Sequence, residues 1–198
     1  MLCKVYCACC NGLEVTTVTV EVSVTDGIQF YLVGLPDSAV KESQQRIESA
    51  LHCYGFRIPG KRITINLAPA NIRKEGSSFD VPIAIGILCA SSQLDEQVAG
   101  RLEEFIILGE LSLDGKLRDI PGALPIIIHA KEQGFKACIL PPSSAMEGAE
   151  MYWMNSRATL SISSRLVMVN VLCINIFRFQ DVDYSVGVLC NPVSLVAL

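Results

Sequence analysis

Residues 13–24 (LEVTTVTVEVSV) alternate between two kinds of side chain with a period of two. Val18, Val20, Val22 and Val24 fall on one side, and threonine, glutamate and serine fall mainly on the other. β-Branched residues in this alternation predict a half-buried β-strand. A strand cannot bury its apolar face alone, so the chain must build a sheet with these valines facing a core.

The segments that follow predict the rest of that sheet and its cover. An Asp26-Gly27 turn followed by residues 28–33 (IQFYLV) predicts a hairpin with the first strand. Asp37 or Ser38 is the expected N-cap of the first helix, and Asp80 is the expected N-cap of the second. Helices are predicted at residues 38–52, 81–90 and 123–133, and further strands at 62–67, 105–108 and 137–140, with a turn through Asp114-Gly115. Alternating strands and helices predict an α/β fold with a mixed β-sheet and packed helices.

Composition excludes some classes of protein. Of the 198 residues, 51% are apolar and 18% are charged, which is ample for a core and unlike a disordered chain. The 16 basic and 20 acidic residues give a formal charge of −4, so a strongly basic nucleic-acid-binding surface is not indicated. The apolar run at 166–177 is too short to cross a bilayer, and we expect no membrane partner.

Four of the nine cysteines, Cys3, Cys7, Cys9 and Cys10, crowd into the first ten residues. Their spacing lacks the paired CxxC pattern of zinc sites, so we expect no metal. In an apolar strand, cysteine more often serves as a small buried hydrophobic residue. The start of the chain does not have the pattern of a secretion signal, which favours reduced thiols and a cytoplasmic location.

Residues 55–62 (GFRIPGKR) match a nucleotide-phosphate loop except at the last position, where Arg62 replaces the Ser or Thr that would hold Mg²⁺. A phosphate loop follows a strand and opens a helix, whereas this segment follows a predicted helix and opens a strand. We therefore interpret it as an ordinary connection, and we expect no bound cofactor in this chain.

Basic side chains gather around two predicted loops. If they share one face, they could contact a phosphate backbone, and the alternative is an ordinary solvated surface. The candidates for DNA or anion contact are Arg57, Lys61, Arg62, Arg73 and Lys74. The second loop continues through Ser77 and Ser78 to the next helix, which leaves open an anion site or a serine nucleophile.

Three long stretches resemble one family, in the same order. They are residues 33–43 (VGLPDSAVKES), 63–88 (ITINLAPANIRKEGSSFDVPIAIGIL) and 108–135 (LGELSLDGKLRDIPGALPIIIHAKEQGF). They resemble the N-terminal domain of the ComM/YifB family, the magnesium-chelatase-like AAA+ ATPases of the ChlI type. The resemblance implies a bacterial cytoplasmic protein whose full-length relatives assemble as hexamers on DNA. It also implies a role in branch migration during recombination and natural transformation, with ATP and Mg²⁺ held by a separate ATPase module.

The same stretches are more distantly similar to the proteolytic domain of Lon, which implies a ribosomal-protein-like βαβ fold. In that register Ser78 stands at the position of the catalytic serine, and Ile126 stands at the position of the catalytic lysine. An isoleucine can neither activate a hydroxyl nor donate a hydrogen bond to it. We therefore expect a noncatalytic domain, with a residual serine hydrolase or a pure oligomerisation and interaction module as the alternatives.

The resemblance covers residues 1–150, which we expect to form the ChlI-type domain. Residues 151–198 do not match, and their composition changes at the same point. Our hypothesis is a divergent tail that is frameshifted or truncated, with the ATPase domain absent. The alternative is a genuine divergent end that completes the sheet.

Overall fold

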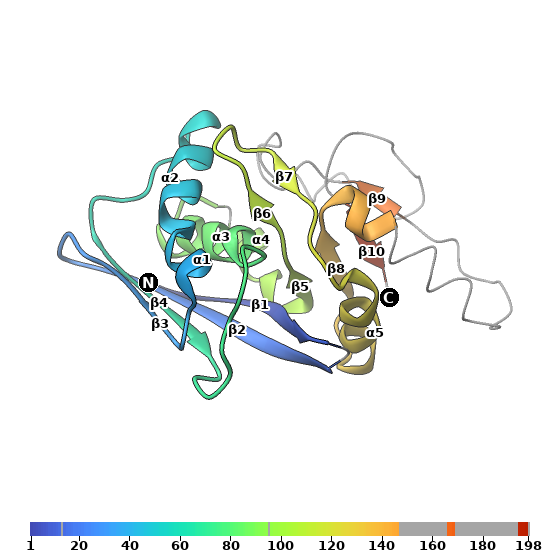
Figure 1. Ribbon diagram of the computed structural model, residues 1–198. Helices are drawn as coiled ribbons and strands as arrows, with labels where there is room; N and C mark the ends of the chain where they lie inside the picture. The colour runs from blue at the N-terminus through green and yellow to red at the C-terminus, as the bar shows by residue number, and fades with distance from the viewer. Residues whose placement is uncertain (13, 95, 147–165, 169–193, 198) are drawn as a thin grey trace, which may run out of the picture.

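A computed structural model describes residues 1–12, 14–94, 96–146, 166–168 and 194–197 (Figure 1). Its main feature is an eight-stranded mixed sheet with the order β3-β4-β2-β1-β5-β8-β10-β9. The strands are β1 (Leu2–Asn11), β2 (Glu14–Thr25), β3 (Phe30–Val33), β4 (Arg62–Ala68), β5 (Phe105–Ile107), β8 (Ala137–Leu140), β9 (Leu166–Met168) and β10 (Ser194–Ala197). The expected α/β fold with a mixed sheet is confirmed. Most of the predicted tail, 151–198, lies outside the described residues.

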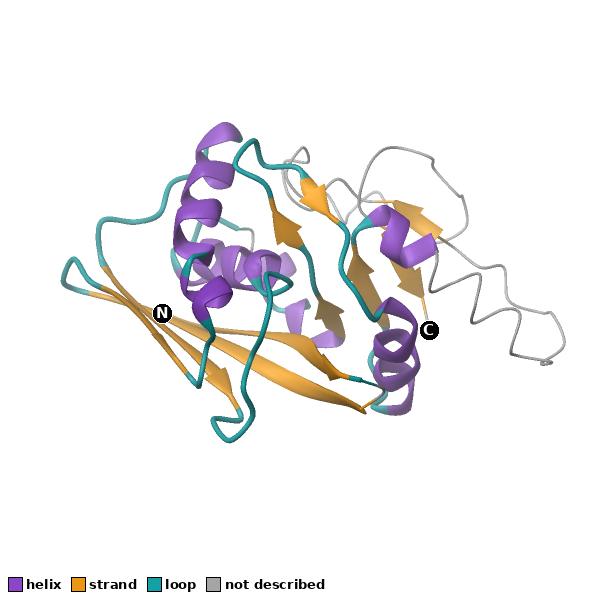
Figure 2. Ribbon diagram, in the orientation of Figure 1, coloured by secondary structure: helices purple, strands orange, loops and turns teal. Residues whose placement is uncertain are grey.

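The helices and two short strands complete the domain. They are α1 (Ser38–Lys41), α2 (Ser43–Cys53), α3 (Asp80–Ala90), α4 (Glu96–Ala99), a 3₁₀ turn η1 (Leu102–Glu104) and α5 (Ala123–Glu132), with the hairpin strands β6 (Glu110–Leu111) and β7 (Leu117–Arg118). Figure 2 shows α1, α2 and α3 on one side of strands β1 to β4. The predicted helix at 38–52 is therefore two helices, with the break at Glu42.

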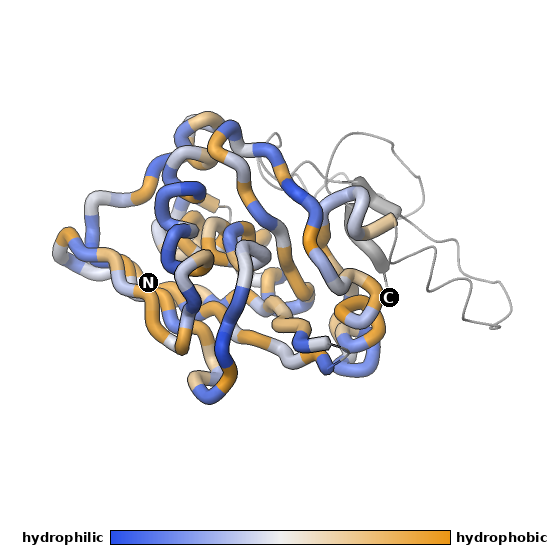
Figure 3. The backbone as a smooth tube through the Cα atoms, in the orientation of Figure 1, coloured by the Kyte–Doolittle hydropathy of each residue, from blue (hydrophilic) through white to orange (hydrophobic). Residues whose placement is uncertain are grey.

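The valine stripe of β2 faces the core, as its alternation predicted. Val18, Val20 and Val22 are fully buried, and Val24 is nearly so. α3 covers them, and every residue of α3 is itself buried. A helix whose side chains are apolar on every face is expected to lie buried between other elements. Figure 3 shows hydrophobic residues along both α3 and the sheet.

A glycine lets α3 approach the sheet closely. A Cβ atom built on Gly86 would lie 2.6 Å from Cγ2 of Val22 and 3.8 Å from Cγ2 of Val5. Because the first distance is far inside van der Waals contact, any side chain at Gly86 would push the helix away from β2. The absence of a side chain therefore sets the spacing between helix and sheet.

The predicted hairpin between β2 and β3 is wrong. β4 lies between them, antiparallel to β2 and parallel to β3. The backbone N–H of Ile63, in β4, donates a hydrogen bond to the carbonyl of Gln29 at 2.8 Å. The loop that joins β2 to β3 therefore passes the start of β4. The reason is pairing length, since β4 offers β2 a seven-residue partner whereas β3 has four residues.

Candidate functional site

The connection between β4 and α3 carries Ser78 and is held in place by Lys74. Nζ of Lys74 donates hydrogen bonds to the carbonyls of Pro69 and of Ile72, the latter at 2.7 Å. The Lys74 side chain has no exposed surface. Burial of the ammonium lowers the pKa of Lys74 below its ordinary value, and the neighbouring Cys9 and Cys7 oppose this shift. Lys74 therefore stabilises the conformation of the loop to which it belongs.

This position contradicts the expectation that Lys74 contributes to a surface for DNA. The remaining predicted cations, Arg57, Lys61, Arg62 and Arg73, are exposed. They do not share one loop cluster, because Arg62 opens β4 while Arg73 follows its other end. Seven residues of strand separate those ends by roughly 20 Å. Arg57, Lys61 and Arg62 thus belong to one connection and its junction with β4, and Arg73 belongs to another.

The two groups of cations also differ in pairing. Nε of Arg73 lies 3.2 Å from Oε1 of Glu75, in an exposed ion pair. Within the described part of the chain, no carboxylate lies within ion-pair distance of Arg57, Lys61 or Arg62. These three side chains are therefore available to an anionic partner, whereas Arg73 already has a neutralising neighbour.

A pocket of about 390 Å³ opens where the end of β1, the β4–α3 connection and α5 meet. Ser78 and Ile126 both line it, so the two positions identified in register with Lon are brought into one cavity. The other lining residues are Ala8, Cys9, Cys10, Asn11, Asn71, Ile72, Arg73, Glu75, Phe79, Leu108 and Pro121. Cys9 and Cys10 were not predicted here, because only the fold brings the end of β1 beside α3.

Neither histidine nor lysine lines this pocket. His129 instead lies 2.8 Å from Oγ1 of Thr17 through its Nε2 atom, and Lys74 is held by its own loop. Ile126 is buried and presents only hydrocarbon. Among the described residues that line the pocket, Ser78 has no strong general base, because Glu75, the one carboxylate among them, is exposed and paired with Arg73.

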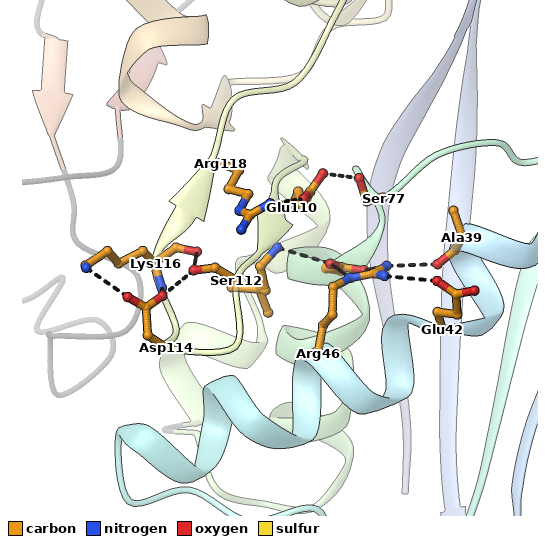
Figure 4. A network of polar contacts seen from close by, with 11 residues as sticks. Ala39, Glu42, Arg46, Ser77, Glu110, Ser112, Asp114, Lys116 and Arg118 are labelled. Atoms are coloured by element: carbon orange, nitrogen blue, oxygen red, sulfur yellow. Dashed lines mark hydrogen bonds and ion pairs between the residues drawn. The ribbon is translucent and has the colours of Figure 1, made fainter.

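A polar network beside the pocket fixes the start of α3 (Figure 4). Nε of Arg46, on α2, donates to Oδ2 of Asp80 at 2.7 Å, and its NH2 group donates to Oδ1 at 2.9 Å. The backbone N–H of Leu111 donates to the same carboxylate at 3.1 Å. Asp80 therefore joins α2, α3 and β6, and the expectation that it caps α3 is wrong, since Phe79 occupies the cap position.

The carboxylate of Asp80 is fully buried, which determines its electrostatics. Burial raises the pKa of Asp80, and the hydrogen bonds from Arg46 and from the Leu111 backbone offset part of that increase. The same contact raises the pKa of Arg46. Asp80 is thus a buried anion that Arg46 binds through two hydrogen bonds. In the sequence the two residues are simply two charges that lie far apart, so the pairing could not be predicted.

A second branch of the network holds the serine loop against the β6–β7 hairpin. Ser77 donates a short hydrogen bond to Oε2 of Glu110. Oε1 of Glu110 lies 3.5 Å from NH1 of Arg118. Gly109 donates to the carbonyl of Ser78 at 2.9 Å and accepts from Val81 at 3.1 Å. One main-chain bond from Gly109 therefore holds Ser78, and the second bond of Gly109 holds Val81, while the side chain of Ser77 is bonded to Glu110.

The segment 55–62 does not fit a nucleotide. It lies between the end of α2 and the start of β4, as interpreted from sequence. Its last residue, Arg62, pairs with Thr25 in the sheet, so the segment leads into a strand and not into a helix whose first amides could bind phosphate. Among the described residues, there is also no cluster of three His, Cys, Asp or Glu side chains that could hold a metal ion. In that same part of the chain, no helix has the length and apolar character needed to cross a membrane.

Comparison with known proteins gives a family and several relatives. Residues 20–144 match the family described as subunit ChlI of Mg-chelatase. The competence protein ComM of Haemophilus influenzae is 49% identical over 129 residues, which are 65% of this chain and 25% of that protein. YifB of Escherichia coli is 43% identical over 129 residues, with the same coverage. The chain spans about a quarter of the length of these relatives.

One more distant relative is a Lon protease. Lon protease 2 of Bacillus subtilis is 32% identical over 106 residues, which are 52% of this chain and 18% of that protein. This similarity agrees with the more distant resemblance to Lon noted from the sequence.

Proposed function

Because the chain belongs to the family described as subunit ChlI of Mg-chelatase, we propose that it is the N-terminal accessory domain of a ComM-type ATPase. In this proposal the whole protein remodels DNA in recombination and natural transformation, and this domain contributes DNA handling without catalysing a reaction. The observation that carries the proposal is the 49% identity to a competence protein. ATP and Mg²⁺ belong to the ATPase module of the whole protein, which acts as a cytoplasmic hexamer.

The chemistry of the pocket supports a noncatalytic role. Ser78 has Ile126 as a neighbour in the same pocket, where a lysine would be needed to accept the serine proton. Lys74 is the nearest lysine in sequence, and two carbonyl groups hold its ammonium. An unactivated serine hydroxyl is a weak nucleophile at neutral pH.

The unpaired cations support DNA handling. Arg57, Lys61 and Arg62 lie within the exposed α2–β4 connection and its junction with β4. Because the whole chain has a formal charge of −4, attraction to DNA needs a local group of cations, and this proposal assigns it to these three. We expect modest, salt-sensitive binding, because each phosphate contact releases a condensed counterion.

The first experiment is fluorescence anisotropy of the chain with single-stranded, duplex and four-way-junction DNA at several salt concentrations. Binding should weaken as salt increases. The triple variant Arg57→Ala, Lys61→Ala, Arg62→Ala should bind more weakly, with its salt slope reduced by about 1 for each lost contact. No binding at low salt would overturn the DNA role of this domain and favour a pure oligomerisation or interaction module.

Arg73→Ala is the matched control. It removes an exposed arginine that lies at the other end of β4 and is already paired with Glu75. DNA affinity should change little in this variant. The triple variant removes three charges and this control removes one, so a loss of binding free energy in Arg73→Ala that is one third of the loss in the triple variant would show that net charge, rather than the α2–β4 connection, determines binding.

A residual serine hydrolase is the second candidate, and Ser78 lining the pocket is the observation that favours it. A fluorophosphonate probe distinguishes the two functions. The noncatalytic proposal expects no labelling that depends on Ser78. Labelling of the wild-type chain that disappears in Ser78→Ala would establish an activated serine and refute the noncatalytic assignment.

A further inference from the structure

The turn between β2 and β3 presents an apolar side chain to solvent. Ile28 is 89% exposed, the largest exposed fraction of any large apolar residue in the part of the chain that the structure describes. It follows Gly27, whose φ of +129° lies in the region that favours glycine. An exposed apolar residue on its own needs no explanation, so the neighbours of Ile28 decide what it can do.

The nearest neighbours are basic. A Cβ atom built on Gly27 would lie 3.1 Å from Cβ and 3.2 Å from Nε of Arg62, so the Arg62 side chain lies against the turn. The strand register agrees, since Arg62 pairs with Thr25 at the end of β2. Lys61 precedes Arg62, and both side chains are exposed. Figure 1 shows the β2–β3 turn and the α2–β4 connection at the same end of the sheet.

Arg57 belongs to this end of the sheet as well. Nε2 of Gln93, just after α3, donates to the carbonyl of Arg57 at 2.9 Å. The preceding residue, Ser92, has its hydroxyl 3.8 Å from the sulfur of Met1. The carbonyl of Met1 in turn accepts a hydrogen bond from the backbone N–H of Val24, near the end of β2. These contacts tie the α2–β4 connection to the strand that leads into the turn.

The charge at this end of the sheet is positive. Asp26, at the start of the turn, is exposed and has no cation within ion-pair distance in the described part of the chain. The three cations Arg57, Lys61 and Arg62 outnumber it. An apolar tip is therefore flanked by cations that have no carboxylate of their own among the described residues, and an anionic partner would complement them.

We propose that the β2–β3 turn is a wedge that enters double-stranded DNA, with Ile28 inserted at a base step from the minor groove and the three cations on the flanking phosphates. This inference rests on the proposed DNA role and adds how the duplex is engaged. Apolar side chains that enter a base step unstack it and kink the duplex. Because pyrimidine–purine steps unstack most readily, the wedge should prefer them.

An anionic lipid surface is the other partner that a basic, apolar tip would suit. The observations favour DNA, because one isoleucine on a narrow turn matches the space of a single base step. Attachment to a membrane needs a larger apolar surface or a second anchor. Vesicles therefore belong in the test as the competing partner.

The experiment uses the full chain and a duplex that carries 2-aminopurine at one pyrimidine–purine step. The fluorescence of this base rises when it loses its stacking neighbour, and anisotropy of an end label on the same duplex measures binding. Saturating protein should raise the 2-aminopurine fluorescence. The rise should be smaller when the base lies within a stiff run of A·T pairs.

Variants of the tip separate insertion from phosphate contact. Ile28→Gln should bring the fluorescence of the saturated complex back to that of free DNA while the salt slope of binding stays the same, because the phosphate contacts remain. Ile28→Phe should keep the rise, since it is also an apolar wedge. Leu113→Gln is the matched control, because it alters a 62% exposed leucine at the β6–β7 turn and should leave the rise intact. Unchanged thermal unfolding of each variant confirms that it is folded.

The outcomes distinguish this inference from the function on which it rests. Salt-sensitive binding without a fluorescence rise, or with a rise that persists in Ile28→Gln, would overturn the wedge and leave the DNA role standing. Absence of binding at low salt would overturn both. Tighter binding to vesicles of phosphatidylserine and phosphatidylcholine than to the duplex, with a loss in Ile28→Gln, would assign the tip to a lipid surface and overturn the wedge.

Discussion

At the scale of single residues, two buried charges organise the region around Ser78. Lys74 and Asp80 have no exposed surface, yet each has hydrogen-bond partners that compensate for lost water. Lys74 is held by carbonyls of its own loop, whereas Asp80 is held by Arg46 from α2. Their roles therefore differ: Lys74 shapes a loop, and Asp80 joins separate elements.

Removing the charge of Asp80 should destabilise the fold. In Asp80→Asn, Arg46 loses its bidentate partner, and the free energy of unfolding should fall by about 3 kcal/mol. Urea denaturation measures the change. The control is Glu42→Gln, which removes an exposed carboxylate 4.0 Å from the same arginine and should cost less than about 0.5 kcal/mol. Equal effects of the two variants would contradict the role given to Asp80.

Lys74 predicts a dependence of stability on pH. Its folded-state pKa is lowered by burial, so above that pKa the unfolded chain binds more protons than the folded chain. Stability should rise as pH increases from the lowered pKa towards 10.5, the ordinary value, because the buried ammonium loses its charge. The nearby thiols of Cys7 and Cys9 have raised pKa values, which delays their ionisation.

The measurement compares the free energy of unfolding of the wild-type chain and of Lys74→Met from neutral pH to about pH 10. The difference, wild type minus variant, should grow with pH. Lys61→Met, which removes an exposed lysine, is the control for the loss of a positive charge. A difference that stays flat or falls for Lys74→Met would refute the interpretation.

At the scale of elements, the contact between α3 and β2 depends on one glycine. Gly86→Ala places a Cβ atom against Val22, so the helix must shift away from the sheet. The clash outweighs the better helix propensity of alanine, and we expect a net loss of about 1–2 kcal/mol in stability. Thermal denaturation checks it, with Gly60→Ala as the control because no atom lies within 4 Å of that site. Equal stability of Gly86→Ala and wild type would contradict this packing.

Element order also explains which sequence predictions failed. The Asp26-Gly27 turn was correctly identified, but the strand after it does not pair with β2, because β4 occupies that edge. Local signals describe neighbours in sequence, whereas β4 lies more than thirty residues further along the chain. Asp80 was correctly placed at a helix start, but its carboxylate is bonded by the partly buried Arg46 rather than by the helix amides.

At the scale of the whole molecule, the free energy of local unfolding should be highest at the centre of the sheet and should decrease towards its periphery. β2 is paired on both sides and covered by α3, whereas β7, among the strands that the structure describes, pairs with β6 alone in a separate two-stranded sheet. Amides of β2 and α3 should therefore exchange hydrogen at least about 100-fold more slowly than those of the β6–β7 hairpin, after correction for intrinsic rates. Hydrogen exchange read by mass spectrometry measures this, and equal protection of the hairpin would contradict the gradient.

The sequence by itself determined the kinds of element and the family. The valine alternation of β2, the apolar run of α3 and the Asp114-Gly115 turn are local patterns, and local patterns depend only on nearby residues. The long matching stretches likewise identified the ChlI-type resemblance, and the same register singled out Ser78 and Ile126.

Only the tertiary structure decided what those residues meet. It inserted β4 between β2 and β3, buried Lys74, separated Arg73 from the other cations, and placed Ser78 and Ile126 in one pocket. The physical reason is that burial and charge pairing depend on distances between segments remote in sequence, and the packing of α3 on the sheet sets those distances.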